Sequence, residues 1–224
     1  LDYMKSHKMV NSKSLIIPGS GIDLNHFHPK FRISKKDNLF RFIFVGRLLK
    51  DKGLRELIAA MDEIVKQAPY TILKIIGIND PDSQSGISIE TLDSWKKKSY
   101  IHFLEETNNV RQYLSYADCL VLPSYREGLS RSILEAMSMG LPVVTTNVPG
   151  CRQLVVDRFN GFLCESKSIS SLIEAMNEVM SLSFSQRQSF GKKGRTIVEQ
   201  KFDIKIVEKS LRDCIIAVQN HDKI

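Results

Sequence analysis

Residues 119–146 read CLVLPSYREGLSRSILEAMSMGLPVVTT, and their pattern decides the fold. The first six residues are an apolar run typical of a buried strand, and residues 130–140 place apolar side chains at helical spacing before a glycine that can end a helix. Residues 141–146 are again apolar and rich in β-branched side chains, which favours a second strand. A strand, a helix and a strand in this order predict two parallel strands joined by a crossover helix.

The same alternation continues along the chain. Further predicted strands cover residues 40–46, 71–77 and 99–104, and further predicted helices cover residues 54–66 and 108–117. Thr107 is the predicted N-cap of the second of these helices, and residues 79–90, rich in Asp, Ser and Gly, predict a surface loop. After residue 165 the pattern changes to three successive helices. We therefore predict an α/β fold, with a mostly parallel sheet covered by helices on both faces and a helical C-terminal tail.

Composition limits the class of protein. The 224 residues include 42% hydrophobic and 25% charged side chains, typical of a globular protein with one substantial core. We predict a single domain over residues 1–224, with a βα core at 14–165 and the helical tail at 166–224. Because no apolar run approaches the roughly 20 residues that span a bilayer, and the N-terminus has no signal-peptide core, we expect a cytoplasmic protein.

The chain begins without an initiator methionine and soon enters a predicted strand near residue 14. We expect it to start within a larger protein, so that an N-terminal partner domain is missing. The four cysteines have neither zinc-ligand nor CxxC spacing and are interpreted as small buried hydrophobic residues. They are Cys119, Cys151, Cys164 and Cys214.

The net charge of +7 is compatible with three classes of partner: nucleic acid, an anionic membrane surface, or phosphate-bearing small molecules. A nucleic-acid-binding module is disfavoured, because the chain has one tryptophan and no basic stripe with interleaved aromatic residues. The cations of WKKK at 95–98 and GKKGR at 191–195 are interpreted as solvated faces, with contact to anionic lipid as the alternative.

Residues that could bind an anionic ligand follow two of the predicted strands. VGRLLKDKG (45–53) puts Arg47 and Lys52 between a strand and a helix N-terminus, which favours anions. An arginine fork and a lysine point charge suit a diphosphate, although both residues could equally be solvated cations. PGSGID (18–23) has glycines that permit a tight turn and a close approach to a ligand. That loop matches neither a Walker loop nor a dinucleotide fingerprint.

Two carboxylates flank the start of the helix after residue 123. Glu127 lies in the loop, and Glu135 lies about a turn and a half into the helix. With the backbone N–H groups of residues 129–131 between them, they suit a polyhydroxylated, phosphorylated ligand, because carboxylates accept hydrogen bonds from hydroxyls and amides bind phosphate oxygens. Both could instead be solvated. The apolar neighbours of Glu135, at positions 133, 134, 136 and 137, argue against that interpretation for Glu135.

The chain resembles the C-terminal, donor-binding domain of the GT-B retaining glycosyltransferases, group 1 (GT4-like). Five segments carry the resemblance: PGSGID, FVGRLLKDKG, LKIIG, YADCLVLPSYREGLSRSILEAMSMGLPVVTTNVPG and NGFL. It covers about residues 14–205, and its core is the E-x7-E pair of Glu127 and Glu135. The resemblance implies a Rossmann-like domain, the C-terminal half of a GT-B fold. It also implies transfer of a hexosyl group from a nucleotide-diphospho-sugar with retention of anomeric configuration.

The resemblance implies three catalytic residues. Glu127 contacts the hydroxyls of the donor sugar and helps to place its anomeric carbon, whereas Arg47 and Lys52 hold the diphosphate and stabilise the charge on the leaving nucleotide. Glu135 accepts hydrogen bonds from the ribose 2′ and 3′ hydroxyls. Because basic groups take the place of a divalent cation, no metal or other cofactor is implied.

The remaining donor-binding residues are implied by the same match. Gly21 and the amides of Gly128, Leu129 and Ser130 lie near the phosphates, and Phe103 and Leu104 hold the base. Two positions depart from the family pattern. Glu105 and Glu106 crowd the expected base site, and Ser20 replaces an asparagine that many members have.

IPGSGIDLNHF and YREGLSRSILEAMSMGLPVVTTNVPGCRQLV look like the bacterial branch that extends lipid-linked oligosaccharides for capsule, O-antigen or glycoprotein glycans, often from UDP-N-acetylhexosamines. This branch implies a glycan or lipid-linked acceptor bound by the missing N-terminal domain, and peripheral contact with the inner face of the plasma membrane. We expect the isolated chain to bind a nucleotide without transferring sugar. Two other enzymes of the same fold are disfavoured: epimerases lack the E-x7-E spacing, and phosphorylases need a pyridoxal lysine context that is not seen.

Overall fold

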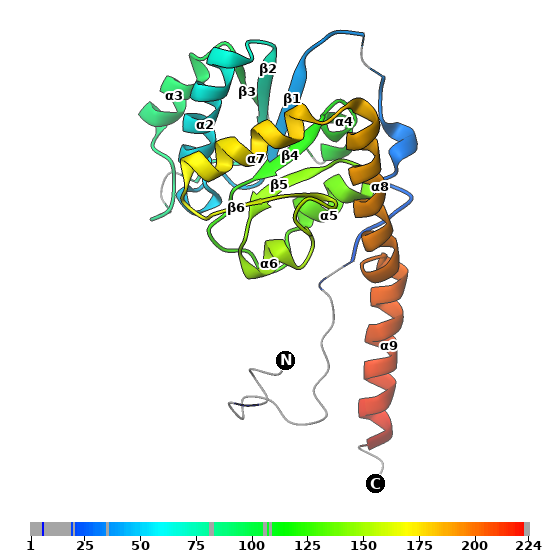
Figure 1. Cartoon of the computed structure of the whole chain (residues 1–224). Coiled ribbons are helices and arrows are strands. Elements are labelled where there is room, and N and C mark those ends of the chain that lie inside the picture. Colours follow the sequence, from blue (N-terminus) through cyan, green and yellow to red (C-terminus); the bar gives the residue numbers. More distant parts are fainter. Residues whose placement is uncertain are drawn as a thin grey trace.

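A six-stranded, all-parallel sheet forms the centre of the molecule, in the order β3-β2-β1-β4-β5-β6 (Figure 1). The computed structural model describes residues 6, 19, 21–34, 36–80, 83–104, 107 and 109–221, with side chains to residue 216. The strands are β1 (Phe40–Val45), β2 (Thr71–Ile76), β3 (Ile101–Leu104), β4 (Cys119–Leu122), β5 (Val143–Thr146) and β6 (Gly161–Cys164). The predicted parallel α/β architecture is confirmed.

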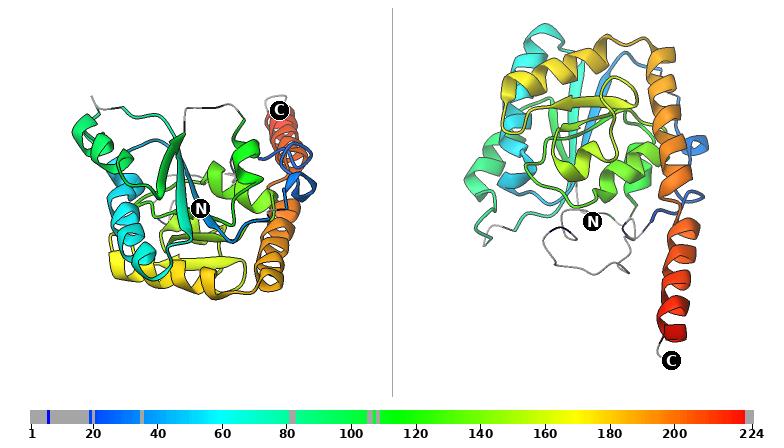
Figure 2. Two further views of the ribbon diagram at one scale, coloured as in Figure 1. Left: turned by 90° about the horizontal axis from the view of Figure 1, so that it is seen from above. Right: turned by 60° about the horizontal axis from the view of Figure 1, so that its bottom comes forward.

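Helices cover both faces of this sheet. They are α2 (Leu54–Gln67), α3 (Ile89–Lys96), α4 (Val110–Leu114), α5 (Arg131–Ser138), α6 (Pro149–Arg152), α7 (Ile169–Ser181), α8 (Phe184–Lys201) and α9 (Ile204–His221), with 3-10 turns η1 (Pro29–Phe31) and η2 (Lys50–Lys52). The α2 and α7 helices pack on each other over one face, whereas α5 lies on the other face with α8 against it (Figure 2). The predicted helical C-terminal region is confirmed, and its last helix, α9, projects away from the sheet (Figure 1).

The central elements follow from their apolar patterns. Residues 40–44 of β1 are all buried, as expected for a strand covered on both faces. In α2 the buried apolar residues recur every three or four positions, so one side of the helix faces the sheet. Gly53, with a φ of 71°, makes the left-handed turn between η2 and α2.

Two local predictions are wrong. The predicted 79–90 loop runs into α3, which begins at Ile89 with Ser88 as its N-cap. The N-cap of α4 is Asn109 rather than Thr107, because the helix begins only at Val110; the Thr107 hydroxyl accepts a hydrogen bond from the Asn109 N–H at 2.9 Å before the helix begins.

Other predictions concern burial and membrane insertion. Cys119, Cys151 and Cys164 are buried as expected, and Cys214 is half-buried. Among the helices that the structure describes, none combines the length and the apolarity needed to cross a bilayer. The predicted strand near residue 14, and residues 20, 105 and 106, lie outside the described part of the chain.

Candidate active site

The candidate site lies where the strand order reverses, between β1 and β4. From β1 the chain continues to β2 on one side, and from β4 it continues to β5 on the other. The chain leaves two such strands toward opposite sides of the sheet, and ligands of open α/β sheets bind at the carboxyl ends of the strands at this point. Here the loops are residues 46–53, after β1, and residues 123–130, after β4.

The two loops make direct backbone contact. The Tyr125 N–H donates a hydrogen bond to the Asp51 carbonyl at 2.8 Å. A Cβ atom added to Gly53 would lie 2.1 Å from the Pro123 carbonyl oxygen, so only glycine permits this approach. A third segment closes on the second loop, because a Cβ atom on Gly150 of α6 would lie 2.1 Å from the Gly128 carbonyl oxygen. The backbone around Glu127 is therefore held from two sides.

An ion pair joins the side chains of the two loops. Lys52 Nζ lies 2.6 Å from Glu127 Oε1, and only 19% and 12% of the two side chains are exposed. A solvated Glu127 is therefore ruled out. A cation that suits phosphate and a carboxylate that suits sugar hydroxyls thus lie side by side at the strand ends.

The second carboxylate, that of Glu135, belongs to the helix α5. Ser130 is the N-cap of this helix, and Glu135 follows one turn after its first residue, Arg131. The Glu135 side chain is 9% exposed, and Arg131 Nε donates a hydrogen bond to its Oε1 at 2.9 Å. Burial raises the pKa of Glu135, and the hydrogen bond from Arg131 partly opposes this shift. The prediction that Glu135 is not a solvated helix residue is confirmed.

The other predicted residues are distributed around this centre. Arg47 is exposed at the start of the first loop, and Phe103 and Leu104 are half-buried at the end of β3, two strands from β1. Leu129 is half-buried in the second loop, whereas Gly128 is exposed there.

Gly21 lies against the end of the fold rather than against the Glu127 loop. A Cβ atom on Gly21 would lie 2.8 Å from Ile204 Cα at the start of α9. Gly19, two residues earlier, does meet the loop of residues 123–130, because its Cβ atom would lie 2.5 Å from Leu129 Cδ2.

Sequence analysis missed the side-chain role of Arg131 and the close backbone approaches of Gly53 and Gly150. The first could have been found from its i,i+4 spacing to Glu135, which brings two side chains together on a helix. The close approaches of the two glycines join residues that are far apart in the chain, so no local sequence pattern predicts them.

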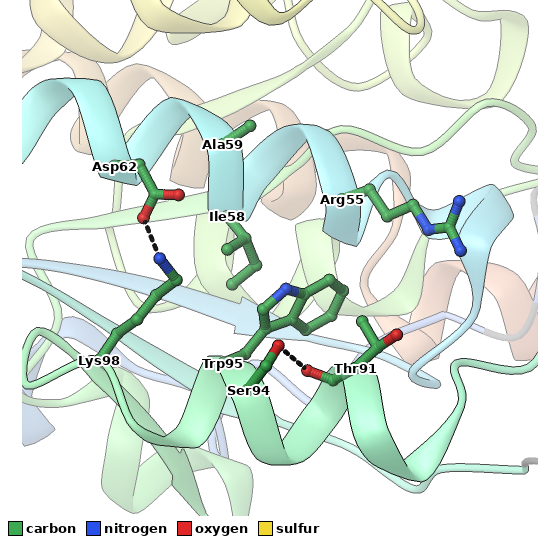
Figure 3. Close-up of a pocket in the computed structure, with 8 residues that line it drawn as sticks. All are labelled: Arg55, Ile58, Ala59, Asp62, Thr91, Ser94, Trp95 and Lys98. Carbon is green, nitrogen blue, oxygen red and sulfur yellow. Dashed lines mark hydrogen bonds and ion pairs between the residues drawn. The ribbon is translucent and has the colours of Figure 1, made fainter.

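A separate open pocket of about 500 Å³ lies between α2 and α3 (Figure 3). Figure 3 shows Trp95 and Ile58 between Arg55 at one end and the ion pair of Asp62 and Lys98 at the other. None of its lining residues belongs to the predicted donor-binding set. Within the described residues, no three or more His, Cys, Asp or Glu side chains are grouped so that they could hold a metal ion.

Comparison with known proteins identifies the family. Residues 27–197 match the family model described as glycosyl transferases group 1. The chain belongs to this family. This group 1 chain is 30% identical over 198 residues to the capsular polysaccharide biosynthesis glycosyltransferase CapM of Staphylococcus aureus, which covers 85% of the chain and 49% of CapM.

A second relative is the UDP-Gal:alpha-D-GlcNAc-diphosphoundecaprenol alpha-1,3-galactosyltransferase of Escherichia coli, 32% identical over 177 residues that cover 75% of the group 1 chain and 45% of the enzyme. The chain therefore spans about half the length of these relatives.

A solved structure supports the same fold. Anabaena HepE in complex with UDP and glucose superimposes with a TM-score of 0.75 and 22% identity, over 87% of the group 1 chain and 55% of HepE. This likeness confirms the predicted Rossmann-like fold.

Proposed function

We propose that this chain is the donor-binding part of a retaining hexosyltransferase that uses a nucleotide-diphospho-sugar, with UDP as its nucleotide. The observation that carries the proposal is the pairing of Lys52 with Glu127, beside Glu135, at the point where the strand order reverses. Membership of the group 1 family supports it. The choice of UDP rests on the names of the Escherichia coli relative and of the HepE complex.

The proposed catalytic centre is formed by Glu127, Arg47 and Lys52. Lys52 binds the diphosphate, and Arg47, which is exposed at the start of the same loop, adds a second cation. Together they stabilise the charge that develops on the nucleotide as it leaves. Glu127 accepts hydrogen bonds from the sugar hydroxyls and places the anomeric carbon. The acceptor attacks from the face that the nucleotide leaves, through an oxocarbenium-like transition state. No metal is needed in this scheme.

The nucleoside is held beside this centre. Glu135 accepts hydrogen bonds from the two ribose hydroxyls, and the amides of Gly128, Leu129 and Ser130 bind phosphate oxygens at the start of α5. Phe103 and Leu104, at the end of β3, contact the base. Gly21 lies near the phosphates only if the donor reaches toward the start of α9, because Gly21 packs there.

The acceptor is a capsule, O-antigen or other lipid-linked glycan, bound by the N-terminal domain of the whole enzyme. A lipid-linked acceptor requires the protein to work at the inner face of the plasma membrane, with peripheral contact to anionic lipid. Because the acceptor site would belong to the other domain, this chain alone binds the donor and transfers little or no sugar.

Calorimetric titration of the chain with UDP, GDP and UDP-N-acetylglucosamine tests the proposal. We expect UDP to bind, and Glu135→Ala to weaken binding by about 10-fold or more, because hydrogen bonds to a charged group contribute roughly 1.5–3 kcal/mol. Glu174→Ala, which removes an exposed carboxylate from α7, is the matched control and should bind like wild type. If wild type binds no nucleotide, or if Glu135→Ala binds as tightly as wild type, the proposal is wrong.

A further inference from the structure

The inference concerns Arg131, the first residue of α5. Its side chain is 71% exposed, yet its Nε donates a hydrogen bond at 2.9 Å to a carboxylate that is 9% exposed. Most exposed i,i+4 ion pairs contribute little to folding. This pair differs because one partner is nearly buried, so the hydrogen bond acts on a carboxylate that water hardly reaches.

Few other charged groups act on Glu135. His26, in the loop before η1, is the other residue that lowers the pKa of this carboxyl. Arg195 of α8 packs near the end of α5, but its guanidinium donates to the Ser138 carbonyl and to Glu199. Lys52 and Glu127 neutralise each other. Among these groups, Arg131 is the one whose side chain donates a hydrogen bond to the Glu135 carboxylate.

We propose that Arg131 is a positioning residue, whose guanidinium keeps the Glu135 carboxylate charged and oriented so that it accepts hydrogen bonds from a ribose diol. The bond from Nε occupies one lone pair of Oε1. Oε2 and the remaining lone pair of Oε1 are then free to accept two vicinal hydroxyls. Without Arg131 this carboxylate would more readily take up a proton, and a protonated carboxyl offers a donor where the ribose needs an acceptor. The inference rests on the proposed role of Glu135 in nucleotide binding.

The pH dependence of binding separates positioning from direct contact. The probe is UDP-glucose, since neither phosphate is a monoester and so the ligand lacks the ionisation near pH ~6 that free phosphate monoesters show. Its affinity is measured by calorimetry from about pH 5.5 to about pH 8 for wild type, Arg131→Gln and Arg131→Lys, a window chosen to lie above the usual glutamate pKa of about 4.3. Arg152→Gln, which removes an exposed cation from α6, is the charge-matched control.

We expect Arg131→Gln to approach the wild-type affinity at the alkaline end and to lose about 10-fold or more at the acidic end, because binding that needs a charged carboxylate weakens by about 10-fold for each unit of pH below the pKa of that carboxyl. Arg131→Lys should restore much of the wild-type profile, and Arg152→Gln should follow wild type throughout. A loss in Arg131→Gln that is equal at every pH would mean that Arg131 contacts the nucleotide itself. A profile that superimposes on that of wild type would mean that the ion pair has no role in binding. Either result overturns the inference.

A measurement without ligand keeps the two proposals separable. The carboxyl carbon of Glu135, assigned with Glu135→Gln, is titrated by ¹³C NMR in wild type and in Arg131→Gln, and both titrations are repeated in a His26→Gln background. A higher midpoint in Arg131→Gln supports the inference, and equal midpoints contradict it. If wild type does not bind UDP-glucose, the proposed function fails, while the NMR titration still decides whether Arg131 controls Glu135.

Discussion

Replacing Lys52 by methionine tests how strongly the two loops of the site are joined. The substitution keeps a side chain of similar length but leaves the Glu127 carboxylate, 12% exposed, without the cation that lies 2.6 Å away. Removing one partner of a fully buried ion pair destabilises a protein by about 3–5 kcal/mol. Since water still reaches 19% and 12% of these side chains, we expect a smaller loss, about 2–3 kcal/mol. For a chain of this size that corresponds to a fall in Tm of about 4–12 °C.

The double variant Lys52→Met/Glu127→Gln should recover most of this loss. It leaves no uncompensated charge, and neutral replacements of a buried pair are often tolerated. We therefore expect its free energy of unfolding within about 1 kcal/mol of wild type, and a coupling energy of about 2 kcal/mol between the two positions.

Urea unfolding followed by fluorescence measures this cycle. The chain has one tryptophan, Trp95, which is buried and so reports on unfolding. Lys66→Met is the matched control, because the Lys66 and Glu63 side chains are 64% and 54% exposed and such pairs contribute at most about 1 kcal/mol. Additive losses in the double variant, or a Lys52→Met loss no larger than that of Lys66→Met, would refute the reasoning.

Three further predictions concern stability. Gly53→Ala should destabilise the chain by about 2–4 kcal/mol, because it adds a Cβ atom at a positive φ and against a backbone carbonyl. Gly128→Ala is the control and should change stability by less than about 0.5 kcal/mol, because nothing lies within 4 Å of the added Cβ atom. Urea unfolding of the two variants compares these values. Arg195→Met should cost about 3 kcal/mol, because the buried guanidinium donates to three backbone carbonyls, two in the segment before η1 and one at the end of α5. Lys192→Met, an exposed neighbour on α8, should unfold like wild type. Glu135→Gln should be more stable than wild type at neutral pH. The pKa of Glu135 is raised in the folded state, so this carboxyl favours folding below its unfolded pKa of about 4.3 and loses that contribution as the pH rises. The increase in the free energy of unfolding that Glu135→Gln produces should therefore become smaller toward about pH 4. An equal gain at both pH values would contradict the raised pKa.

Much of the fold could be predicted because its central elements are strongly apolar. The apolar runs at 40–46 and 119–124 contain β1 and β4, strands that helices cover on both sides, so these runs predict strands clearly. The strand β6 begins with glycine, a residue with a low preference for strands, and α3 buries only two of its eight residues. Such weakly patterned elements carry too little signal to be recognised from sequence.

The candidate site divides in the same way. The burial of Glu135 could be predicted, because its apolar neighbours within the helix are adjacent in sequence. The contact between Lys52 and Glu127 joins residues 75 positions apart. It depends on β1 and β4 being neighbours in the sheet, and strand order is not encoded in any local pattern. The approach of Gly150 to the Glu127 loop is non-local for the same reason.

The close backbone contacts at Gly53 and Gly150 have a consequence for protein engineering. In both loops of the site, a glycine Cα packs directly against a backbone carbonyl, or a backbone carbonyl packs against a glycine Cα. Such close packing does not accommodate an added or deleted residue. Grafting a loop of different length from a relative would therefore displace the carboxylates together with the backbone. A different preference for the proposed donor should instead be sought by exchanging an exposed side chain on an unchanged loop, such as that of Arg126. A library of point substitutions at this position would explore selectivity without moving the backbone around Glu127 or replacing the proposed catalytic residue Arg47.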